Sequence, residues 1–69
     1  MEGRAKEGDR LKLVSPSPFD IAVGMRPGLE AEVLEGGDTI IKVRFKEWRN
    51  PAAPLFDKGE RVMLLKCFN

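Results

Sequence analysis

The chain has 69 residues, a hydrophobic fraction of 42% and a charged fraction of 33%, which leaves room for one globular domain. Its formal net charge is only +1, whereas proteins that bind nucleic acid without sequence specificity depend on a strong positive excess. One cysteine and no histidine exclude an internal disulfide, a serine triad and a usual zinc site.

The N-terminal segment is polar, and we expect residues 1–7 to form a flexible tail and residues 8–69 to form the single domain. The tail lacks the apolar stretch of a signal peptide. No run approaches the ~20 apolar residues that span a bilayer, so we expect a cytoplasmic location and no membrane contact. Alternating polar and apolar residues predict a first strand over residues 10–14, which the prolines of residues 15–18 end.

The next segment, residues 19–26, carries apolar side chains at every second position. We expect a loop there that folds back on the core, since no segment has the spacing of a helix. Phe19 and Phe56 are expected to be core or lid residues. Pro27-Gly28 then marks a turn.

The central hairpin is predicted from two strands, residues 29–35 and 39–46, which flank Gly36-Gly37-Asp38. A three-residue turn would place Asp38 in the left-handed region. The resulting cross-strand pairs are Leu29 with Phe45, Ala31 with Val43, Val33 with Ile41, Glu30 with Arg44, and Glu32 with Lys42. The first three pairs share the core face and the last two place acids beside bases, so a slip of one residue would bury charge.

The last predicted strand, residues 61–65, is almost continuously apolar, which indicates burial on both faces. Short strands joined by glycine and proline turns in so few residues predict an all-β fold, closed into a small barrel. Closure would remove exposed strand edges.

Three segments, residues 8–13, 25–33 and 39–45, resemble in their order the SH3-like small β-barrels, including KOW-type and other bacterial and phage SH3-like domains. The resemblance extends from about residue 8 to residue 65. It implies a small SH3-like barrel of about five short antiparallel strands and a bacterial or phage protein. It also implies a binding module, which in KOW-type domains contacts nucleic acid.

The residues that catalysis or metal binding would need are missing. Cys67 has no histidine to activate it, so we expect a structural or surface thiol instead of a nucleophile. The carboxylates lack the spacing of a calcium loop. We therefore expect no enzyme, no cofactor and no metal site, but a non-catalytic interaction or accessory domain.

The first functional hypothesis is protein binding through Trp48, Arg49, Leu34 and Ile40. Trp and Arg are enriched among the residues that dominate interfaces, and the predicted register leaves Leu34 and Ile40 pointing outward. Two alternatives stay open: Trp48 plugs one end of the barrel, and the C-terminal segment with Phe68 covers the two aliphatic side chains. A homo-oligomer is a further possibility.

The second hypothesis, the less favoured one, is nucleic-acid binding of the KOW-like type. Its candidate contacts are Arg10, Lys12, Lys46 and Arg49, the cations that the predicted register leaves without an acidic partner across the strand. Trp48 would then stack on bases of a single strand.

Overall fold

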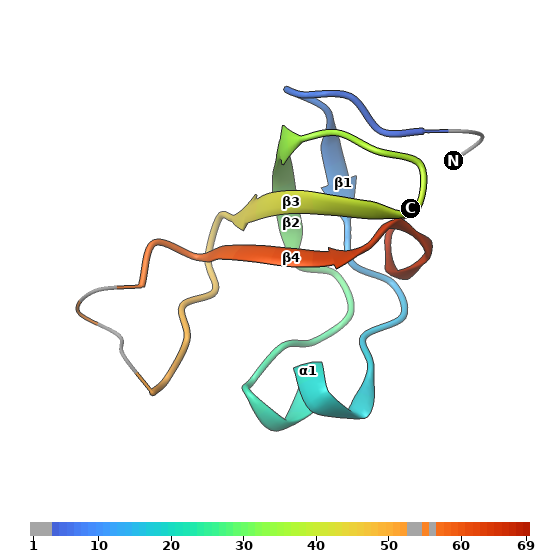
Figure 1. Ribbon diagram of the computed structural model, residues 1–69. Coiled ribbons are helices and arrows are strands. Elements are labelled where there is room, and N and C mark those ends of the chain that lie inside the picture. Colours follow the sequence, from blue (N-terminus) through green and yellow to red (C-terminus); the bar gives the residue numbers. More distant parts are fainter. Residues whose placement is uncertain (1–3, 53–54, 56) are drawn as a thin grey trace.

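The computed structural model describes residues 4–52, 55 and 57–69, and its strands form one antiparallel sheet in the order β1-β2-β3-β4 (Figure 1). The elements in chain order are β1 (Arg10–Lys12), α1 (Pro18–Ala22), β2 (Glu30–Glu35), β3 (Ile40–Phe45), β4 (Glu60–Leu64) and the 3₁₀ helix η1 (Leu65–Cys67). The all-β prediction is confirmed. Within the described residues there are four named strands instead of five, and the sheet is not a closed barrel, because β1 and β4 are its two edges.

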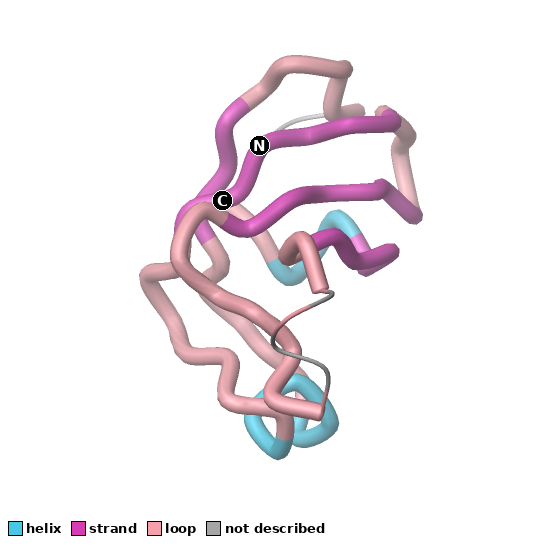
Figure 2. Tube along the Cα trace, turned by 90° about the vertical axis from the view of Figure 1, so that its left-hand side faces the viewer, coloured by secondary structure: helices cyan, strands magenta, loops and turns pink. Residues whose placement is uncertain are grey.

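The sheet bends between β2 and β3. Figure 1 shows β3 and β4 running across β1 and β2, so that one face of the sheet wraps around the core. A bulge between Val33 and Glu35 lies in β2, and such bulges increase the local bend and twist. Figure 2 shows the strands gathered towards one end of the molecule and α1 at the other, joined by loops.

The hairpin register differs from the predicted one by two residues. The observed partners are Ala31 with Phe45, Glu32 with Arg44, Val33 with Val43, and, beyond the bulge, Glu35 with Lys42. Side chains alternate with a period of two, so a shift of two residues keeps every side chain on its predicted face. Val33 and Val43 are accordingly buried, at 1% and 0% exposure.

The tip of the hairpin is wider than a three-residue turn because other segments use its backbone groups. Gly37 exchanges two hydrogen bonds with Ala5 (2.9 and 3.0 Å), and Thr39 O accepts from Leu65 N (2.8 Å). No non-glycine residue in the described ranges has a positive φ, so the predicted left-handed Asp38 is wrong.

The N-terminal segment also packs against this tip. Ala5 is buried, at 1% exposure, so the packed part of the chain includes a residue that the sequence assigned to a tail. A Cβ on Gly36 would collide with the carbonyl oxygen of Ala5. This close approach explains the need for glycine there.

The helix α1 corrects the prediction of a loop over residues 19–26. Ser17 is its N-cap and Pro18 follows at the first helical position, where the missing N–H of proline costs nothing. Phe19 is 78% exposed and not a core residue; Phe56 lies outside the described residues. Met25, after the helix, is fully buried. The described helices have five and three residues, and neither could cross a membrane.

The C-terminal residues cover the outer edge of β1. Lys12 N donates to Asn69 O (3.1 Å) and Asn69 N donates to Lys12 O (2.8 Å). Leu13 and Phe68 form an isolated β-bridge. The ring of Phe68, 6% exposed, stacks on that of Phe45 with centroids 6.1 Å apart.

The prediction that β4 is buried on both faces is wrong. Met63 is 7% exposed, but Val62 is 65% exposed and Leu64 is 41% exposed. The core covers only the inner face of the strand. The apolar run therefore alternates between core and solvent like the other strands.

Candidate functional site

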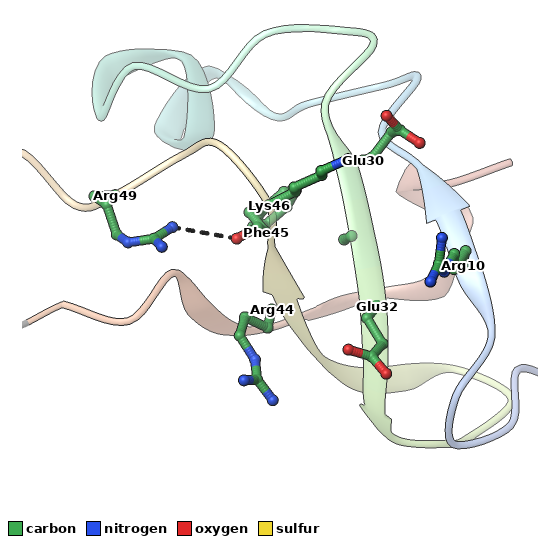
Figure 3. Close-up of a pocket in the computed structure, with 8 residues that line it drawn as sticks. Arg10, Glu30, Glu32, Arg44, Phe45, Lys46 and Arg49 are labelled. Atoms are coloured by element: carbon green, nitrogen blue, oxygen red, sulfur yellow. Dashed lines mark hydrogen bonds between the residues drawn. The ribbon is translucent and has the colours of Figure 1, made fainter.

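The outer face of the sheet carries a row of alternating charges. Arg10 on β1 lies opposite Glu32 on β2, Glu32 lies opposite Arg44 on β3, and Arg44 lies opposite Glu60 on β4. Figure 3 shows the first three of these side chains in a row across the strands. Neighbours of opposite charge stabilise the sheet modestly and leave this face nearly neutral.

A shallow hollow of about 310 Å³ opens beside this row. It is lined by Arg10, Glu30, Ala31, Glu32, Arg44, Phe45, Lys46 and Arg49. We call this the basic hollow, since four cations and two carboxylates surround it. Arg49 is fixed at one side, where its Nη1 donates to Phe45 O (3.3 Å) and to Trp48 O (2.8 Å), the former drawn in Figure 3.

The structure brings together three of the four predicted nucleic-acid contacts. Arg10, Lys46 and Arg49 line the basic hollow, whereas Lys12 does not. The expectation that Arg10 and Lys12 lack acidic partners is wrong, because Lys12 lies opposite Glu30 and Arg10 opposite a second glutamate. The sequence missed these pairs because the partner of β1 was not assigned.

The indole of Trp48 lies in the core, at 5% exposure. Its Nε1 donates to Val23 O (3.0 Å), and its ring meets that of Phe45 edge-on at 5.8 Å between centroids. The guanidinium carbon of Arg61 lies 5.5 Å from the Trp48 ring centroid. These contacts favour the alternative that Trp48 plugs one end of the sheet.

Asp20 and Arg61 form a structural link that sequence reasoning missed. Asp20 is 6% exposed, and its Oδ2 accepts from both N and Oγ of Ser17 at 2.9 Å. Its Oδ1 lies 3.4 Å from Nη2 of Arg61 on β4. The spacing Ser17-Pro18-Phe19-Asp20 was the available signal, because a serine three residues before an acid is a helix-start motif.

Aliphatic side chains gather on the outer face of β3 and β4. Ile40 lies opposite Leu64, and Val62 lies on the same face two residues before Leu64. Ile40 is 56% exposed, so the expected cover by Phe68 is wrong for this residue. We call Ile40, Val62 and Leu64 the β4 patch. Leu34, the fourth predicted contact, is half-buried at the β2 bulge.

The backbone beside the β4 patch has an unpaired edge. Phe45 N donates to Gly59 O (2.8 Å), and hydrogen-bonded residues alternate along an antiparallel pair. Every second residue from Gly59 onward therefore directs its backbone N–H and C=O groups towards β3. The residues that direct N–H and C=O away from β3 are Glu60, Val62 and Leu64, and within residues 4–52, 55 and 57–69 no other segment bonds to them.

The described residues contain no cluster of three or more histidine, cysteine, aspartate or glutamate side chains that could hold a metal ion. Cys67, whose thiol is free, is buried at 8% exposure. The surface thus offers three features for binding: the basic hollow, the β4 patch and the β4 edge.

Comparisons of the chain with protein-family models, with curated proteins and with solved structures found no significant match. A function must therefore be sought in the residues described above.

Proposed function

We propose that this chain is a non-catalytic interaction module that binds another protein chain at the edge of β4. The observation that carries the proposal is the coincidence of the β4 patch with an unpaired strand edge. An edge of this kind binds an extended segment as an additional strand, with main-chain hydrogen bonds for affinity and side chains for specificity. The fitting partner is a segment with apolar residues at every second position.

The β4 edge lacks three of the features that protect edge strands, namely proline, lysine and a bulge. Proteins discourage edge pairing with prolines, outward lysines or bulges. Residues 60–64 contain no proline or lysine, and β4 pairs with β3 without irregularity. Two of its three outward side chains are aliphatic. A covering partner would relieve this exposure.

Among the predicted protein contacts, Ile40 gives the strongest support, since it belongs to the β4 patch. Arg49 remains a proposed protein contact, because its side chain is exposed at the rim of the basic hollow. Trp48 and Leu34 offer less accessible surface, because one is buried and the other is half-buried. The proposed contact thus lies further along the sheet than the sequence indicated.

The test is photo-crosslinking in cells with a benzophenone amino acid at position 62. The matched control carries the same amino acid at position 12, which is exposed on the opposite edge strand. We expect one identified protein to be crosslinked from position 62 and not from position 12. We also expect Leu64→Lys to abolish this adduct. Equal adducts from both positions, or none from position 62, would overturn the proposal.

We propose in addition that the sheet is a variant of the SH3-like barrel. Support comes from the C-terminal segment, which after η1 bridges Leu13 through Phe68 and bonds Lys12 through Asn69. This segment occupies the place of a fifth strand beside β1. Residual amide protection at Asn69 as strong as that of β1 in hydrogen exchange would support the assignment, and free exchange there would contradict it.

Nucleic-acid binding is the second candidate, favoured by the four cations of the basic hollow. Glu30 and Glu32 in the same lining reduce its attraction for phosphates. A titration with single-stranded RNA and DNA at low salt decides the question, with Arg44→Ala as the variant. Binding that weakens steeply with salt and with this substitution would favour this candidate; no binding at low salt would remove it.

A further inference from the structure

We propose that the strand that occupies the β4 edge is β4 of a second copy of this chain, paired antiparallel about a two-fold axis at Val62. This inference rests on the proposed function, because it names the partner of the same edge. A two-fold pairing uses the same surface on both copies and closes as a dimer. The sheet would then continue through eight strands.

The available backbone groups select the register. Only residues that direct N–H and C=O outward can form a hydrogen-bonded pair, which on each copy means Glu60, Val62 and Leu64. Pairing centred on Val62 places Val62 opposite Val62 and Glu60 opposite Leu64 of the other copy. All three residues whose backbone groups point away from β3 then form hydrogen bonds, about six in total between the two copies. A shift of two residues would leave about four.

The side chains agree with this register. Directly opposed residues of an antiparallel pair share a face, so the two valines meet at the centre of the outer face. Leu64 and Ile40 of each copy flank them, which makes the two β4 patches one continuous apolar surface. At each end Glu60 lies beside Leu64 of the other copy, and its carboxylate is already partnered by Lys42 of its own chain, 4.0 Å away.

Charge also permits the pairing. The chain carries a net charge of only +1, so two copies repel weakly. Lys66 follows Leu64 by two residues and is exposed. In this register Leu64 lies opposite Glu60 of the other copy, so Lys66, in η1 directly after the strand, is the nearest cation in the sequence to that end of the pairing.

The test combines the oligomeric state with a disulfide that reports the register. Opposed Cα atoms of a hydrogen-bonded pair are about 5.5 Å apart, within the range that a disulfide spans. Val62→Cys is therefore expected to form a crosslinked dimer under mild oxidation. Leu64→Cys is the matched control, because its two copies would lie about 13 Å apart along the strand, too far to be bridged.

Wild-type protein, whose only thiol is the buried Cys67, controls for other disulfides. Sedimentation of the wild type should show a species of twice the 7.7 kDa monomer mass that grows with concentration, and Val62→Lys should remain monomeric with an unchanged circular dichroism spectrum. A wild type that stays monomeric, or a dimer in which Leu64→Cys crosslinks as readily as Val62→Cys, would overturn the inference. A position-62 adduct with a different protein in the cell would then leave the proposed function standing, and its absence would remove both.

Discussion

The two edge strands of this sheet differ in whether another segment of the chain pairs with their outer edge. The outer edge of β1 is covered by the C-terminal segment, through paired hydrogen bonds between Lys12 and Asn69 and a bridge between Leu13 and Phe68. The outer edge of β4 bonds to no other segment that the structure describes. One sheet thus contains both a protected edge and an unprotected edge.

The difference between the edges shows which part of the surface is available for recognition. A protected edge adds to the stability of the fold, whereas an unpaired edge offers hydrogen bonds to another strand. The β4 patch adds apolar contact at the unprotected edge only. Substitutions at the two edges should therefore separate stability from association.

The largest effect is expected at the protected edge, from Phe68→Ala. The substitution removes a buried ring that stacks on Phe45, and changes of this kind cost about 3–5 kcal/mol of unfolding free energy. Urea denaturation measures the loss. Phe19→Ala is the matched control, since Phe19 is 78% exposed, and equal losses for both variants would contradict the assigned core.

Replacement of valine by threonine should destabilise the protein more on the core face of the sheet than on its outer face. Val43→Thr places a hydroxyl at a fully buried position and should cost about 1–3 kcal/mol. Val62→Thr makes the same change on the outer face of β4 and should stay within about 0.5 kcal/mol. Denaturation at low protein concentration, where association is minor, measures both. A larger loss at Val62 would show that the outer face is covered within the monomer.

The ion pair that links α1 to β4 is tested by Asp20→Ala, which should lower stability. The substitution removes the bonds that the Asp20 carboxylate accepts from the N-cap residue Ser17 and the ion pair with Arg61, at an expected cost of about 1–3 kcal/mol. Thermal unfolding provides the measurement, and Asp38→Ala, at an exposed position in the hairpin tip, is the control. An unchanged midpoint for Asp20→Ala would show that this link contributes nothing.

The smallest effect is expected from the charges near the unprotected edge. Lys42 Nζ lies 3.6 Å from Glu35 Oε2 and 4.0 Å from Glu60 Oε1, in exposed surroundings. Exposed pairs contribute about 0–1 kcal/mol, so Lys42→Ala should lower stability slightly, and less so at high salt. A double-mutant cycle with Glu35→Ala isolates one pair. A coupling that does not depend on salt would contradict this interpretation.

The sequence predicted which side chains face the core in the central hairpin, because alternation determines the face. It could not determine the register, since a shift of two residues preserves that alternation. The hairpin tip is bonded to Ala5 and Leu65, which come from distant parts of the chain. Local turn rules therefore favoured the wrong pairing.

The candidate site was only partly predictable for a similar reason. Ile40 was identified as outward-facing, but Val62 and Leu64 belong to an apolar run that looks fully buried. Exposure of these two side chains depends on whether another layer covers the outer face, and no local pattern contains that information. Asp20 was missed because the alternation of apolar residues over 19–25 favoured a loop and hid the helix-start spacing from Ser17 to Asp20.

The C-terminal cover of β1 has a consequence during protein synthesis. Leu65, Cys67 and Phe68 are core residues, and they follow all four strands of the sheet along the chain. While these three residues are still inside the ribosome, the core cannot be completed, and the apolar inner face of the sheet remains accessible to solvent. The interior can therefore close only after Phe68 has left the ribosome, later than in a domain whose core residues all lie in its first half.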